Sequence, residues 1–158
     1  MPVPTWMKDW NDIIRYVIFP DEELKNLMCV PENTTIIDFI DHYFIRAGYT
    51  NELLEKEDVR IVYGDVDSKP TAVPNVLENT LSFDIYVRKE KLHNATNDRL
   101  MYRTHLIANR LNMLLTKGGT SGKYLGGYRF WPNKEMDLGT RTVGYVRYNI
   151  SFKYMRVY

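Results

Sequence analysis

Residues 142–157 read TVGYVRYNISFKYMRV and form the longest alternating stretch in the chain. Apolar or aromatic residues occupy every second position, and mostly polar residues lie between them. Successive side chains of a strand point to opposite faces of a sheet, so this pattern predicts a long strand with one buried face. The buried face is expected to hold Val146, Tyr148, Ile150, Phe152 and Tyr154, and the exposed face Arg147, Asn149, Ser151 and Lys153.

The same period of two predicts shorter strands at residues 59–63, 80–88 and 128–131. The cleanest alternation lies in residues 80–88, TLSFDIYVR, which we expect to be a half-buried strand. Residues 66–79 contain Pro70 and Pro74, and proline cannot donate a hydrogen bond to a neighbouring strand. We therefore expect residues 66–79 to form an irregular connection.

Apolar residues spaced by three and four predict helices in the first third of the chain and at residues 97–115. Prolines divide the first third into three short helices, because the residue before a proline avoids the helical conformation. Asp21 is suited to cap the second helix, and Asn33 or Thr34 the third, which should stop at Gly48. The third helix is expected to bury Ile36, Ile37, Ile40, Tyr43, Phe44 and Ala47.

These elements predict an α+β fold in which N-terminal helices precede a mostly antiparallel sheet with one long helix packed on its face. We expect residues 1–158 to form a single domain. Residues 1–57 would be its mainly helical segment, and residues 58–158 would supply the sheet and the long helix. The composition, 44% hydrophobic and 26% charged, is that of a globular protein and not of a disordered one.

Charge and composition exclude several classes of protein. The net charge of +1 is too small for a protein that holds nucleic acid chiefly by its phosphates. One cysteine rules out an intramolecular disulfide framework. No apolar run approaches the roughly 20 residues needed to cross a bilayer, and the first ten residues lack the apolar core of a signal peptide. We therefore expect no membrane association, and synthesis in a cytosol-like compartment.

The sequence also offers little catalytic chemistry. Residues 118–123, GGTSGK, resemble a phosphate-binding loop, but they follow a predicted helix and lack the required spacing of glycine and lysine. The only histidines are His42, His93 and His105, and none belongs to a local metal-binding or nucleophile motif. We expect no catalytic residue, no bound metal and no cofactor, and hence a protein that is not an enzyme.

Two regions are candidates for contacts with other molecules. Residues 117–127 contain five of the nine glycines and are expected to order on assembly. The last strand is rich in basic residues. The candidate subunit or partner interface consists of Lys117, Gly119, Lys123, Tyr124, Arg141, Arg147 and Lys153. An alternative is that the glycine-rich loop and the basic strand form a module that binds nucleic acid or a small ligand.

The order of elements in residues 58–158 resembles the tail terminator proteins of long-tailed bacteriophages. Both have a strand, a loop, a long helix, a glycine-bearing loop, a short strand and a closing long strand. The closest textual similarities are FDIYV at residues 83–87, YRF at residues 128–130 and VRYNISFKY at residues 146–154. Residues 1–33 add helical material that the simplest members of the family lack, which leaves open another neck or tail-completion component.

The resemblance implies a structural protein of the virion, made in the host cytoplasm and located in the tail or neck. Its subunits would form a homo-oligomeric ring, a hexamer by the resemblance, at the head-proximal end of the tail tube. The ring would stop polymerisation of the tail tube protein and join the tail to the head-completion or connector protein. DNA would pass through its lumen without specific binding.

Overall fold

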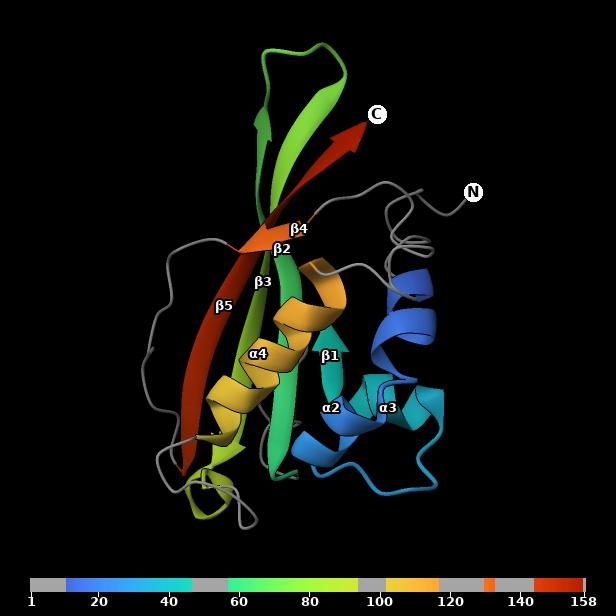
Figure 1. The fold of residues 1–158 in the computed structure, drawn as a ribbon, viewed down its shortest axis with the longest axis vertical. Helices are drawn as coiled ribbons and strands as arrows, with labels where there is room; N and C mark the ends of the chain where they lie inside the picture. The colour runs from blue at the N-terminus through green and yellow to red at the C-terminus, as the bar shows by residue number, and fades with distance from the viewer. Residues whose placement is uncertain (1–10, 47–56, 94–101, 117–129, 133–143, 158) are drawn as a thin grey trace.

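The computed structural model describes residues 11–46, 57–93, 102–116, 130–132 and 144–157 (Figure 1). It contains helices and a mixed sheet of five strands, which confirms the predicted α+β class. The helical elements are η1 (Ile14–Ile18), α2 (Glu22–Leu27), α3 (Ile36–His42), η3 (Lys89–Lys91) and α4 (Arg103–Thr116). The strands are β1 (Phe44–Arg46), β2 (Val59–Pro70), β3 (Val76–Arg88), β4 (Phe130–Pro132) and β5 (Tyr145–Val157).

The sheet has the strand order β1-β2-β3-β5-β4. Strands β2, β3 and β5 are long and antiparallel, β4 pairs antiparallel with β5, and only the pairing of β1 with β2 is parallel. The prediction of a mostly antiparallel sheet is therefore confirmed. On β5, Tyr148, Ile150, Phe152 and Tyr154 are buried as expected, whereas Val146 is only half-buried.

The prediction of an irregular connection at residues 66–79 is wrong, because most of these residues belong to β2 and β3. The turn between the two strands spans only residues 71–75. Pro70 is tolerated because it is the last residue of β2, where β1 has already ended, so its missing N–H breaks no ladder bond to β1. A register shift between Asp65 and Asp67 takes up one extra residue. Asn75 turns the chain with a φ of 62°.

The third helix is shorter than predicted and leads into a strand that the sequence did not indicate. Thr35 caps α3, its hydroxyl oxygen accepting a hydrogen bond from the Asp38 N–H at 3.2 Å. The helix ends at His42, because the carbonyl of Tyr43 already accepts a hydrogen bond from the Ile61 N–H at 2.8 Å. Phe44 then pairs with Ile61 as the start of β1. Of the helix itself, only Phe39 is buried.

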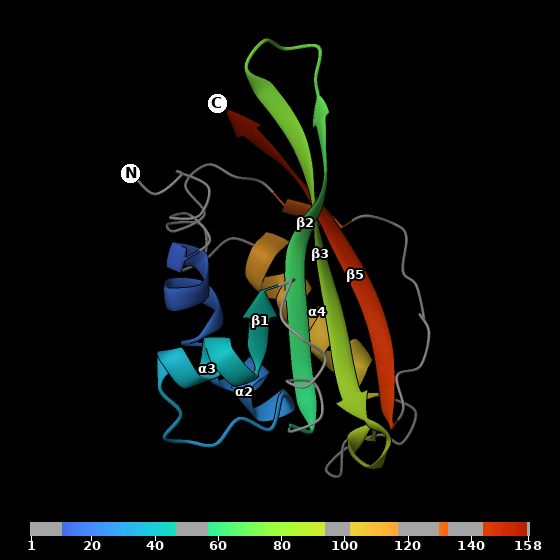
Figure 2. The same cartoon turned by 180° about the vertical axis from the view of Figure 1, so that it is seen from behind.

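Helix α4 packs against one face of the sheet, where it contacts β3, β4 and β5 (Figure 1). Ile107, Leu111 and Leu115 supply its buried stripe, while Leu114 is only partly buried. The predicted start of this helix, including Leu100, lies outside the described residues. Figure 2 shows the opposite face of β3 and β5, which no described helix covers. The prediction of one long helix on one face of the sheet is thus confirmed.

The N-terminal helices complete the core from the side. Ile14 opens a π-helical turn, in which its carbonyl accepts a hydrogen bond from the Phe19 N–H at 2.8 Å. Asp21 caps α2 as predicted and accepts a hydrogen bond from the Leu24 N–H at 2.9 Å. One cluster of buried residues extends from Ile13 to Tyr154. Residues 1–10, which include Trp6 and Trp10, lie outside the described residues.

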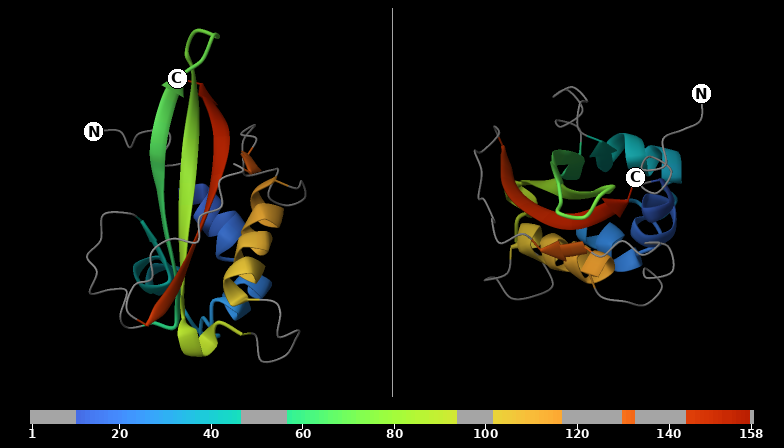
Figure 3. Two further views of the ribbon diagram at one scale, coloured as in Figure 1. Left: turned by 90° about the vertical axis from the view of Figure 1, so that its left-hand side faces the viewer. Right: turned by 90° about the horizontal axis from the view of Figure 1, so that it is seen from above.

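The long strands continue past the helices and form a projecting arm (Figure 3). The arm comprises the 71–75 turn, the ends of β2 and β3 that adjoin it, and residues 155–157 of β5. Its strands are paired throughout: Pro70 pairs with Leu77, and Val76 pairs with Val157. Because all three strands also run through the core, the arm is an extension of the sheet and not a separate unit.

None of the helices in the described ranges is long and apolar enough to cross a membrane.

Candidate functional site

The structure places two of the seven predicted interface residues. Arg147 and Lys153 both lie on β5, on the face of the sheet opposite α4. The alternation of side chains along the strand predicted this placement. The remaining five lie outside the described residues, so the structure does not bring them together with the strand: Lys117, Gly119, Lys123, Tyr124 and Arg141.

Arg147 is held by a carboxylate of its own subunit. Its Nε and Nη2 donate hydrogen bonds to Oδ1 of Asp84 at 3.0 and 2.7 Å. Asn149 lies directly across from Asp84 in the β3–β5 register and donates to the same oxygen at 2.6 Å. Burial raises the pKa of the adjacent Tyr86 phenol, and the charge of Asp84 raises it further. Arg147 therefore belongs to a satisfied network and is not a free cation.

Lys153 is similarly engaged, because its Nζ lies 3.5 Å from Oε1 of Glu78 on β3. The polar face of β5 is also less exposed than predicted: Arg147 and Lys153 are half-buried, and Ser151 is buried. Each of the two basic residues has a carboxylate partner, so this part of the strand presents little net positive charge. The described part of the predicted basic surface thus offers little to attract a phosphate backbone.

Arg60 on β2 is the largest fully buried side chain in the described part of the chain. Among the described residues, its Nε, Nη1 and Nη2 find no hydrogen-bond partner. Burial lowers the pKa of the guanidinium, and the nearby carboxylate of Glu57 opposes this effect. An unpaired buried charge is destabilising. Of the described residues, Arg60 has the most buried side-chain nitrogens without a hydrogen-bond partner.

Two tyrosines lie close to this buried charge. Burial raises the pKa of Tyr43 to about 12, with further contributions from the charge of Glu57 and a hydrogen bond to it. The hydroxyl of Tyr145 donates to the carbonyl of Glu57 at 2.7 Å and accepts a hydrogen bond from Nε of Arg88 at 3.1 Å. Hydrogen bonds therefore link this end of the sheet to the residues that precede β2.

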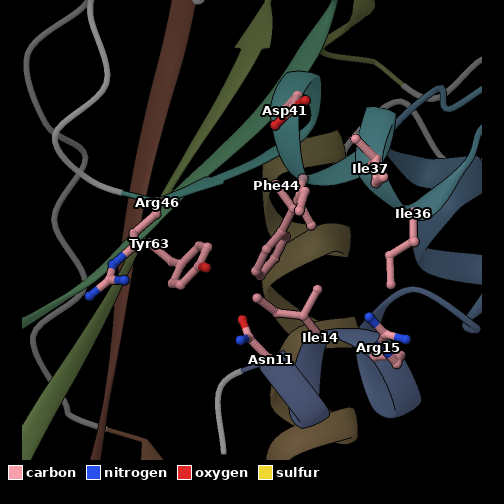
Figure 4. A pocket seen from close by; sticks show the side chains of 10 residues that line it. Asn11, Ile14, Arg15, Ile36, Ile37, Asp41, Phe44, Arg46 and Tyr63 are labelled. Atoms are coloured by element: carbon pink, nitrogen blue, oxygen red, sulfur yellow. The ribbon is translucent and has the colours of Figure 1, made fainter. Parts of the chain in front are cut away.

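A groove lies between η1, α3 and the edge of the sheet, and we call it the α3 groove (Figure 4). It has a volume of about 360 Å³. Phe44 and Tyr63 line it from the sheet, their rings stacked with centroids 4.9 Å apart, and Ile14 lines it from the N-terminal helix. Its lining also includes charged side chains from three elements: Arg15, Asp41 and Arg46.

The third side of the α3 groove consists of isoleucines that the sequence assigned to the core. Ile37 is 64% exposed and Ile40 is 37% exposed, and Ile36 is half-buried beside them. The predicted burial of Ile36, Ile37 and Ile40 is therefore wrong, because α3 turns Phe39 toward the core instead. Their helical spacing was the available signal, but it does not distinguish a face buried in the subunit from one that awaits a partner.

The described residues contain no group of three or more side chains suited to hold a metal ion. His93 and His105 are engaged with aromatic rings: His93 with Tyr102 at 5.4 Å, and His105 with Tyr148 at 4.6 Å between centroids. The glycine-rich segment 118–123 lies outside the described residues. The chemistry that the described residues offer is thus apolar contact at the α3 groove and paired charges on the sheet.

Comparison with known protein families finds no family model that matches the chain, and comparison with curated proteins finds no match either.

Proposed function

We propose that this chain is a non-enzymatic structural subunit of the head–tail junction of a long-tailed bacteriophage. It would act as a tail terminator, forming a homo-oligomeric ring, with six subunits as in the family it resembles. The ring caps the tail tube protein, binds the head-completion or connector protein and lets DNA pass through its lumen.

One observation carries the proposal: an exposed apolar groove and a projecting arm occur on a domain whose elements follow the order of that family. Ile37 on the groove and Val73 at the arm tip are 64% and 59% exposed. Contiguous exposed apolar surface typically marks a site of protein contact. A protein whose role is assembly needs such surfaces and needs no catalytic residue.

The polar face of the sheet supports an assembly role more than the alternative of a nucleic-acid module. Arg147 and Lys153 are paired with Asp84 and Glu78. A lumen that conducts DNA without retaining it would require such neutralised charges, because free cations would bind phosphates strongly at low salt.

Negative-stain microscopy and sedimentation velocity of the purified full chain, alone and mixed with polymerising tail tube protein from the same phage, test the proposal. We expect rings in solution or at one end of each tube, together with tubes of uniform length. A chain that stays monomeric and leaves tube length unchanged would contradict a terminator role. Salt-dependent DNA affinity lost in Arg147→Gln and Lys153→Gln would favour the nucleic-acid alternative.

A further inference from the structure

The α3 groove has an apolar floor and an exposed apolar side. Ile14 and Phe44 form the floor, and both are buried in the subunit. Ile37 and Ile40 lie at the open side and are 64% and 37% exposed. They are three residues apart on α3, so they share one face of that helix. Contiguous exposed apolar surface of this kind typically marks a site where another molecule binds.

Two arginines flank this floor. Arg15 follows Ile14 in η1. Arg46 shares the face of β1 that carries Phe44, because alternate residues of a strand point the same way. Both arginines are exposed, and Figure 4 shows them on opposite sides of the floor. An apolar centre with a guanidinium on either side suits an apolar group flanked by carboxylates.

One carboxylate adds selectivity to the groove. Asp41 lines it from α3, so the described charged side chains of the lining are two arginines and one aspartate. Their net charge of one positive unit favours an acidic ligand over a basic one. A carboxylate placed beside Asp41 would be repelled, so the ligand must keep its acidic groups on the arginine sides.

The open side of the groove favours a protein segment as the ligand. A small molecule usually has most of its surface enclosed by its site, whereas Ile37 at the rim is 64% exposed. A protein segment brings further surface, which covers Ile37 and Ile40. The volume of about 360 Å³ then holds its anchoring side chains. Nucleic acid is disfavoured, because the floor is apolar and the net charge is small.

We propose that the α3 groove binds a segment of a partner protein in which one or two large apolar side chains are flanked by acidic residues. The apolar side chains pack on Phe44, Ile37 and Ile40, and the acidic residues pair with Arg15 and Arg46. The inference goes beyond the proposed function, because it defines the chemistry of a partner and requires neither a ring nor a tail tube.

The two kinds of contact have different roles. Apolar burial supplies most of the affinity, because ion pairs at an exposed rim contribute little free energy. The arginines supply the selectivity, since they repel segments of the wrong charge. Binding should therefore weaken only modestly as salt is added, and it should be lost when the apolar side of the groove is disrupted.

Selection of short random peptides on the purified full chain tests the chemistry of the ligand. Ile37→Asp protein, checked for native thermal unfolding, is used to remove peptides that bind elsewhere. We expect the enriched sequences to share one or two large apolar residues flanked by aspartate or glutamate. Enriched sequences that are basic, or that share no apolar residue, would overturn the inference. An absence of enrichment that depends on Ile37 would also overturn it.

Fluorescence anisotropy with the most enriched peptide tests the two arginines. The double variant Arg15→Glu/Arg46→Glu should raise the dissociation constant about tenfold. The double variant Lys89→Glu/Lys91→Glu makes the same change of charge and should leave the constant within about twofold. Lys89 and Lys91 are exposed on η3, outside the described lining of the groove. Equal weakening by the two double variants would indicate a general effect of charge and overturn the inference.

This inference and the proposed function fail separately. Rings or capped tubes from a chain that selects no acidic apolar peptide would overturn the inference and leave the terminator role standing. Selective peptide binding by a chain that never caps a tube would support the inference and remove the terminator role. Self-association that Ile37→Asp abolishes, without enrichment of acidic peptides, would identify a second copy as the occupant and overturn the proposed partner.

Discussion

Arg60 and Arg147 are two arginines on the same face of one sheet that differ in burial and in their hydrogen-bond partners. Arg147 donates two hydrogen bonds to Oδ1 of Asp84, whereas the fully buried guanidinium of Arg60 has no hydrogen-bond partner among the described residues. Removing a buried charge that lacks a partner relieves a desolvation cost, and removing one member of a pair leaves the other member unsatisfied.

We therefore expect Arg60→Met to leave the free energy of unfolding unchanged or to raise it by about 1–2 kcal/mol. Arg147→Met, the matched control on the same face, should lower it by about 1–2 kcal/mol because Asp84 loses its cation. Urea denaturation at neutral pH measures both changes. A large destabilisation by Arg60→Met would show that this guanidinium has a partner in solution.

Tyr43 should make the stability of the protein sensitive to alkaline pH. Its pKa is raised to about 12 from an ordinary value of 10.0, first by burial and then by Glu57. The folded state thus favours the neutral phenol. The resulting stability is fully present below pH 10 and is lost as the pH rises from about 10 to about 12.

We expect Tyr43→Phe to cost about 1 kcal/mol at pH 7, through the lost hydrogen bond, and to flatten the alkaline decline in stability. At pH 12 the variant should equal or exceed the wild type, which chemical denaturation across pH 8–12 would measure. Tyr16→Phe, at a site that is 44% exposed, controls for the loss of a phenol. Parallel wild-type and Tyr43→Phe curves would contradict this account.

At the scale of elements, one ion pair fastens α2 to α4. The carboxylate of Asp21 both caps α2 and accepts hydrogen bonds from Arg110 at 2.6 and 2.9 Å. Burial raises the pKa of this carboxyl, but the hydrogen bonds from Arg110 and from the Leu24 N–H outweigh burial and lower it below its ordinary 3.8. The stabilisation is therefore present above pH 3.8 and is lost as the pH falls through the lowered value.

We expect Asp21→Asn, which keeps the cap, to cost about 2 kcal/mol at pH 7, with the difference from the wild type shrinking below pH 4. Glu23→Gln is the matched control. Glu23 contacts the same Arg110 but its side chain is 65% exposed, so its loss should cost less than about 0.5 kcal/mol. Thermal melts across pH 2–7 measure both. A pH-independent deficit in Asp21→Asn would exclude the ion pair as its cause.

Elements differ in how far the sequence predicted them. The alternation in residues 80–88 and 142–157 predicted β3 and β5, because one face of each strand is largely buried. Residues 36–44 satisfy helical spacing as well as any helix, but Phe44 and Ile45 are held by parallel pairing with β2. Such long-range pairing overrides local preference and leaves no local signal. Pro70 and Pro74 led to the wrong prediction of an irregular connection at residues 66–79, because the effect of a proline depends on which edge of the strand its missing N–H would face.

The candidate site shows the same division. Because alternate residues of a strand share a face, the sequence predicted that Arg147 and Lys153 lie on the polar face of β5, and they do. Their neutralisation by Asp84 and Glu78 depends on the register between β3 and β5, which one strand alone cannot specify. The α3 groove was missed because burial of an apolar helical face is a property of its neighbours and not of its own sequence.

At the scale of the whole molecule, a chain of aromatic rings crosses the core. Phe39 contacts Phe44, Phe44 contacts Phe83, and Phe83 contacts Phe152, with centroids 5.8 to 5.9 Å apart. Phe19 extends the chain into the N-terminal helices at 5.3 Å from Phe39. Packing of this kind couples the helices to the last strand.

We expect Phe152→Ala to lower the free energy of unfolding by about 3–5 kcal/mol, since the ring is 1% exposed. Phe39→Ala at the other end of the ring chain should lower the midpoint of the same transition. Calorimetry would show one cooperative peak in the wild type and in both variants. Two separate peaks, or a shift of only a degree or so for Phe152→Ala, would contradict a shared core.

The continuity of β2, β3 and β5 from core to arm has a mechanical consequence. A force applied to the tip acts along the strands, so it loads the ladder of paired residues from Val76–Val157 to Arg88–Tyr145 in shear and not one bond at a time. A bending force meets three strands joined edge to edge. The arm should therefore behave as a stiff beam anchored in the core, and displacement at its tip would be transmitted to the sheet face that carries Arg147 and Asp84.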